Sequence, residues 1–243
     1  MAEVAADVTE HPARGSPKRT ARLAGVFQLL EGATATFGQI YLLNSFIVAR
    51  DPAATAERIL ADQPLFQIGF ALSLAAVALH LGRALMMFEL LKIVRRNVAR
   101  FALLAIVVGC AIQAVACVFY LAPLAVLNSA SLGSPVAQLQ DISYLMLRLN
   151  GQAFNAYLFF FGLWNLLIGY LIYRSDFMPR ILGVLLMVTG VAWMLHLYPL
   201  IASQLTLPIM VGAAIGELPL LVWLLAKGVD DERWRRQAQA QRI

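Results

Sequence analysis

Apolar runs of about 20 residues recur along the chain, and they constrain its fold more than any other feature. A helix of that length crosses a hydrocarbon core about 30 Å thick. Composition agrees, because 60% of the 243 residues are hydrophobic and only 14% are charged. Soluble domains have about 45–50% apolar and about 25% charged residues. We therefore predict an all-α integral membrane bundle.

Six transmembrane helices are predicted, at about residues 22–48, 64–91, 101–127, 141–173, 179–198 and 206–226. They form one transmembrane domain over 21–227, between a polar cytoplasmic tail (1–20) and a charged one (228–243). Asp51 and Pro52 predict a short surface helix, because Asp is a favoured N-cap and Pro a favoured first residue. Loops are expected at 128–135 and 203–208. The fourth span should be about 30 residues long, so its start near Tyr144 should project past the bilayer or tilt.

Basic residues set the expected orientation. Fifteen of the 19 Lys and Arg residues precede the first span, follow the sixth, or lie beside the second and fourth loops between spans. Cytoplasmic segments carry such an excess, so this alternation predicts an even number of spans with both termini in the cytoplasm. The location expected is the cell (plasma or inner) membrane. Because topology accounts for the net charge of +5, the partners expected are the bilayer and an unidentified membrane protein or second copy, and not nucleic acid.

Four ionisable side chains within the predicted spans are the first site candidates: Glu31, His80, Arg83 and Glu217. A charge inside a bilayer is costly, so it marks a functional site by default. At about 1.5 Å per residue, the four lie about 13–18 Å from the cytoplasmic ends of their helices. We predict that Arg83 pairs with Glu31, Glu217 or both, with His80 on the same helix face. This cluster could fix helix packing, bind a polar ligand or relay protons.

A second polar group is expected nearer the outside: Arg148, Asn150, Gln152, Asn155 and His196. It could line an external vestibule or mark an interfacial helix end. The zinc, nucleophile and phosphate motifs of common enzymes are missing from the sequence, so no catalytic residue is assigned. His80 and His196 are expected at unequal depths, which disfavours haem ligation. We expect no cofactor and no metal.

The stretch GYLIYRSDFMPRILG, residues 169–183, resembles a family of bacterial integral membrane proteins, domain-of-unknown-function family 4386. The shared features are a Gly-Tyr helix end, a polar Ser turn, a proline and a Leu-Gly helix start. Weaker similarity at 22–25 and 51–59 extends the resemblance over roughly residues 20–228. The resemblance implies a multi-pass bacterial membrane protein. It implies no functional residue, since the family has no assigned activity.

Three functions remain open from the sequence. The lack of catalytic motifs and of large soluble domains favours a non-enzymatic structural or regulatory membrane component. The first alternative is a small-molecule or proton-coupled transporter or channel, which needs a polar path between the inner cluster and the outer group. The second is an intramembrane enzyme that uses Glu31, His80 or Glu217 as acid or base. A cavity that connects the cluster to water would discriminate among them.

Overall fold

The computed structural model describes residues 16–129, 135–197 and 199–240, and it describes no side chain of residues 199–210. Every regular element in these ranges is helical, which confirms the predicted all-α class. In chain order the elements are α1 (Pro17–Ala35), η1 (Thr36–Leu42), α2 (Leu43–Phe46), α3 (Pro52–Ala61), α4 (Gln63–Leu91), α5 (Arg96–Asn128), α6 (Val136–Tyr173), α7 (Arg180–Leu195), α8 (Pro199–Ala226) and α9 (Asp231–Ala240).

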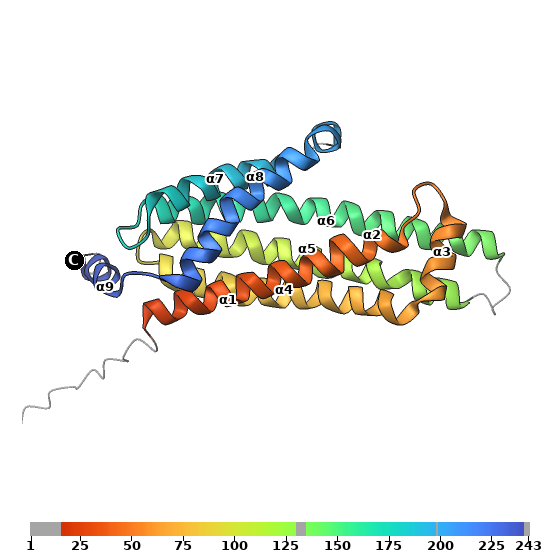
Figure 1. Cartoon of the computed structure of the whole chain (residues 1–243), viewed down its shortest axis with the longest axis horizontal. Helices are drawn as coiled ribbons and strands as arrows, with labels where there is room; N and C mark the ends of the chain where they lie inside the picture. Colours follow the sequence, from red (N-terminus) through yellow and green to blue (C-terminus); the bar gives the residue numbers. More distant parts are fainter. Residues whose placement is uncertain (1–15, 130–134, 198, 241–243) are drawn as a thin grey trace, which may run out of the picture.

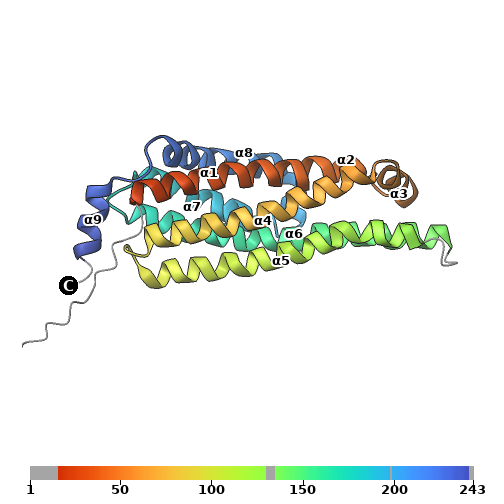
Figure 2. The same cartoon turned by 90° about the horizontal axis from the view of Figure 1, so that it is seen from below.

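The long helices run along a common axis, with α3 across one end of the bundle and α9 at the other (Figures 1 and 2). The most extensive contacts join α5 to α6, α6 to α7, and α1 to α4. The main apolar core draws side chains from all of these helices and from α8. The start of α1 and the C-terminal α9 lie at the same end of the bundle (Figure 1).

The first long helix is not uniformly α-helical, as the prediction at 22–48 assumed. It is continuous from α1 through α2, but seven residues in its second half, η1, form a π-helix. Gly38 lets this segment press against α4, since a Cβ there would lie 2.7 Å from the Gly69 carbonyl oxygen. The Tyr120 hydroxyl of α5 donates to the Gly38 carbonyl at 3.3 Å. Short π-helical segments within α-helices are often found at functional sites.

Several helices begin earlier than predicted. The polar tail predicted to reach residue 20 ends before Pro17, the first residue of α1. The cause is an N-cap that only the tertiary structure supplies: the Asp231 carboxylate of α9 accepts from the Lys18 backbone N–H at 2.8 Å and from the Ser16 hydroxyl at 2.7 Å. A carboxylate at a helix N-terminus satisfies an otherwise orphan donor and complements the helix dipole.

Helix α6 confirms the prediction of an unusually long fourth helix, since it has 38 residues and begins at Val136 rather than near 141. The short surface helix is also confirmed as α3, with the Asp51 side chain accepting from the Ala54 N–H at 2.9 Å. The loop predicted at 203–208 is wrong, because these residues lie inside α8. Pro199 can open a helix at its first position, so no later loop is needed. Most of the loop predicted at 128–135 lies outside the described residues.

Glycines bring α6 and α7 into backbone contact. A Cβ on Gly169 would lie 2.7 Å from the Gly183 carbonyl oxygen, and one on Gly183 would lie 2.5 Å from the Gly169 oxygen. Gly162 and Gly190 repeat this contact one step further along the same helices. Gly169 and Gly183 are the first and last residues of the stretch that resembles the known family. That stretch is therefore a tight helical hairpin closed by two glycines.

Three described helices are long and apolar enough to cross a membrane: α4, α5 and α6. The count rises to four if the bent pair formed by residues 211–226 and α9, whose axes meet at 102°, is one span. Helix α7 is apolar but has only 16 residues. The first helix is divided by η1, and α8 is described with its side chains only from residue 211 onward.

Candidate functional site

An ion pair between α1 and α4 forms the centre of the candidate site. Arg83 Nη1 donates to Glu31 Oε2 at 2.7 Å, and His80 Nδ1 lies 2.7 Å from Glu31 Oε1. Exposure is 7% for Glu31, 1% for His80 and 2% for Arg83. The predicted pairing of Arg83 with a carboxylate is thus confirmed for Glu31. An ionised carboxylate only accepts hydrogen bonds, so Nδ1 is the nitrogen of His80 that carries the proton facing it.

Aromatic side chains of α6 cover this ion pair. The Arg83 guanidinium lies over the Trp164 ring at 4.6 Å from its centroid. The His80 ring meets Trp164 and Phe161 edge-on, with centroids 5.1 Å and 5.4 Å apart. The Tyr157 hydroxyl lies 3.3 Å from His80 Nδ1. Sequence reasoning missed this wall, although residues spaced 157, 161 and 164 share one face of a helix.

Glu217 on α8 has different partners from those predicted. Its Oε1 accepts from Trp193 Nε1 of α7 at 2.9 Å and from Asn165 Nδ2 of α6 at 3.2 Å. In the described part of the chain, no cation lies within 4.0 Å of this carboxyl group. Arg83 forms its ion pair with Glu31 and not with Glu217. Of the two carboxylates predicted as partners of Arg83, only Glu31 forms the ion pair; Asn165 and Trp193, which sequence reasoning missed, contact Glu217 instead.

A small cavity opens beside Glu31, with a volume of about 30 Å³. Gln39 of η1 and Gln113 of α5 line it, and the Oε1 atom of each is buried without a protein partner among the described residues. A volume of this size holds one or two water molecules. Pockets for small organic ligands measure about 300–1,000 Å³. The cavity can therefore hydrate the polar groups around Glu31, but it is too small for an organic substrate.

Asn150 belongs to the interior and not to an outer vestibule. It is fully buried, accepts from Gln39 Nε2 at 2.8 Å, and donates to the Ala116 carbonyl at 2.8 Å. It thus joins η1, α5 and α6 through one amide. This use as interhelical glue is typical of amides inside membrane bundles.

The other members of the predicted outer group point in different directions. Arg148 and Gln152 are exposed, and Asn155 and His196 are partly buried. Residues four apart on a helix share a face and residues two apart do not, so Arg148 and Gln152 face away from Asn150. His196 packs edge-on against Trp193 at 6.0 Å. The structure does not bring these five residues together as one site.

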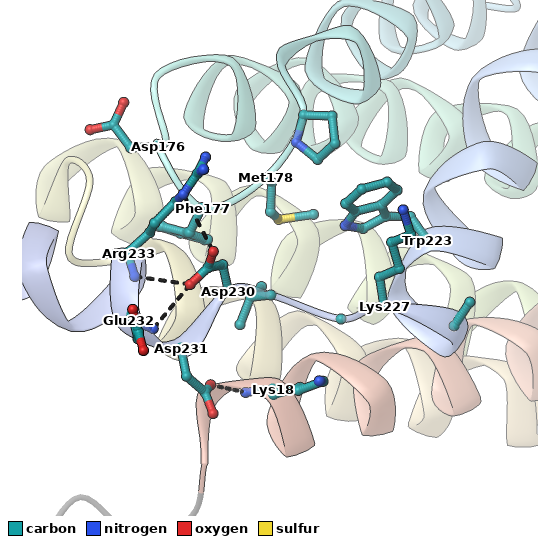
Figure 3. A pocket seen from close by; sticks show the side chains of 14 residues that line it. Lys18, Asp176, Phe177, Met178, Trp223, Lys227, Asp230, Asp231, Glu232 and Arg233 are labelled. Carbon is teal, nitrogen blue, oxygen red and sulfur yellow. Dashed lines mark hydrogen bonds and ion pairs between the residues drawn. The ribbon is translucent and has the colours of Figure 1, made fainter.

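A larger hollow of about 760 Å³ lies where α8 turns into α9 (Figure 3). The turn is made at Gly228, whose φ of 69° favours glycine. Asp231 is bonded to the start of α1 through the Lys18 N–H, and Arg233 Nε lies 3.3 Å from Asp230. Both acidic and basic side chains line it (Figure 3). This mixture selects no ligand charge, so the hollow is a consequence of how α9 docks.

Large apolar side chains cover the outside of the bundle, among them Leu104, Val118, Val188 and Val222, each more than half exposed. Soluble monomers rarely expose so much contiguous apolar surface. Together with the long apolar helices, this surface defines the class: an all-helical protein with three to four candidate membrane spans. The chain belongs to the family described as Domain of unknown function (DUF4386), whose profile matches residues 23–228. No curated protein and no solved structure matches the chain.

Proposed function

We propose that the chain is a six-span protein of the bacterial cell membrane with both termini in the cytoplasm. Six helical segments support the count once the first helix (17–46), the 16-residue α7 and α8 are added to the three long apolar helices. The start of α1 and α9 lie at one end of the bundle, as an even number of spans requires (Figure 1). Basic residues are concentrated in the segments at that same end, and cytoplasmic segments of membrane proteins carry an excess of Lys and Arg.

Labelling of single cysteines tests this topology. Cys110 and Cys117 are first replaced by Ala, and one cysteine is introduced at Val98, Leu132 or Arg236. A membrane-impermeant thiol reagent added to whole cells should label only position 132. Positions 98 and 236 should react only after the membrane is opened. Labelling of either from outside, or protection of 132, would contradict the model.

Within this topology the chain works as a non-enzymatic structural or regulatory membrane component, through a partner membrane protein or a second copy. One observation carries this proposal: the buried polar groups join helices to one another around a cavity of only about 30 Å³. A transporter of organic molecules or an intramembrane enzyme needs room for its substrate. The charged residues here hold the bundle in register.

Complementation separates this role from transport or catalysis. In a deletion strain, the double variant Arg83→Met, Glu31→Gln removes both charges of the ion pair while keeping similar side-chain volumes. If the pair is structural, the double variant should restore the parental phenotype once it reaches parental levels in the membrane. A double variant that is present at parental levels but inactive would show that the charges themselves perform the function.

A further inference from the structure

The charges inside the bundle do not balance. Glu31 is buried and Glu217 is partly exposed, and Arg83 is the only Lys or Arg within ion-pair distance of either carboxylate among the described residues. Because Arg83 pairs with Glu31, Glu217 has no cationic side chain as an ion-pair partner. An uncompensated charge in an apolar interior is costly, and such a group commonly neutralises instead. One further positive charge is therefore required.

Hydrogen bonding indicates which group takes that charge. Both oxygens of Glu31 have partners, and Arg83 already neutralises it. His80 also contacts Glu31, so neither His80 nor Arg83 forms an ion pair with Glu217. Glu217 is arranged differently: Oε1 accepts both N–H donors, while Oε2 has no partner among the described residues. A protonated carboxyl group is compatible with this arrangement, since its carbonyl oxygen accepts both bonds and Oε2 carries the proton. Glu217 is partly exposed, so that hydroxyl group is not sealed inside the bundle.

We propose that Glu217 is a proton-binding site that holds one exchangeable proton in the folded protein and so makes the interior neutral. The proposal goes beyond the structural role above. It rests on the proposed topology only because that topology places these helices within the membrane. The titratable or charged groups on the surrounding helices are Glu31 of α1, His80 and Arg83 of α4, Cys110 of α5 and Tyr157 of α6. From α7, the neutral Trp193 indole contributes its N–H.

The ligand shell favours a proton over a metal cation. The groups that contact the Glu217 carboxyl are N–H donors, whose positive ends repel a metal ion. The described residues contain no group of three His, Cys, Asp or Glu side chains close enough to hold a metal.

Infrared spectroscopy of the protein in proteoliposomes tests the proposal, because a protonated carboxylic acid has a carbonyl stretch separate from carboxylate bands. At neutral pH the wild-type protein should show one such band, shifted in D₂O. The Glu217→Gln variant should lose it and remain folded, since Gln reproduces the shape and accepting oxygen of the neutral acid. The matched control Glu89→Gln removes a carboxylate that is 57% exposed and should leave the band unchanged.

A second variant tests the charge balance itself. In Glu31→Gln the remaining carboxylate, Glu217, can pair with Arg83, so the band should disappear at neutral pH although Glu217 is present. Absence of the band in the wild-type protein, or its survival in Glu217→Gln or Glu31→Gln, would overturn the proposal. A band that appears only when Na⁺ is replaced by choline would also overturn the proposal, because Na⁺ and not a proton would then neutralise Glu217. The topology test at positions 98, 132 and 236 is independent of all these outcomes.

Discussion

Replacing Arg83 by Met should lower the free energy of unfolding by about 4–6 kcal/mol. Met keeps an unbranched apolar side chain but removes the donor that lies 2.7 Å from Glu31 Oε2. Bulk water cannot replace this donor readily, since Arg83 is 2% exposed. Breaking a buried pair by removing one partner costs about 3–5 kcal/mol. The lost contact of the guanidinium with Trp164, now 4.6 Å from the ring centroid, adds about 1 kcal/mol.

Reversible unfolding in mixed micelles, followed by circular dichroism, measures this loss. The double variant Arg83→Met, Glu31→Gln should recover most of the stability, because no unpaired charge then remains beside His80. The single variant should also lose less stability at pH 5 than at pH 8, since protonation of Glu31 removes the unpaired charge. A single-variant loss below about 1 kcal/mol, or a double variant no more stable than the single, would refute the reasoning.

Three further predictions concern the packing. Gly169→Ala should destabilise the bundle by about 1–3 kcal/mol in the same unfolding assay, because the new methyl group would lie 2.7 Å from a backbone oxygen. The control Gly32→Ala, which has nothing within 4 Å of the new methyl group, should be neutral or stabilising. Asp231→Ala should cost about 1 kcal/mol and speed hydrogen exchange at the first turn of α1, which loses its cap; unchanged exchange would contradict that role. Asn150→Leu should cost about 1–3 kcal/mol by leaving the Gln39 amide unpaired, and Gln39→Leu added to it should restore part of the loss.

Hydropathy predicted the helical class and most helix positions because apolar length is what a bilayer selects. The pairing of Arg83 with a carboxylate was also predictable, since residue counting gives depth and an unpaired charge at that depth is costly. The depth of a residue along a helix does not tell which way its side chain faces around the helix axis. Glu217 and Arg83 were placed at similar depths, but the indole of Trp193 and the amide of Asn165 contact Glu217 instead. Both are neutral, so no charge pattern in the sequence signals them.

The π-helix explains why the polar interior extends further than an α-helical wheel allows. At 3.6 residues per turn, Gln39 would lie about 80° around the helix from Glu31, eight residues earlier. The wider turn of η1 rotates each residue by less, which brings Gln39 back toward the face of Glu31. Both side chains accordingly line the same cavity, and Gln39 continues to Asn150. Polar contacts thus run from the ion pair to the middle of α6 because the first helix changes its pitch at Thr36.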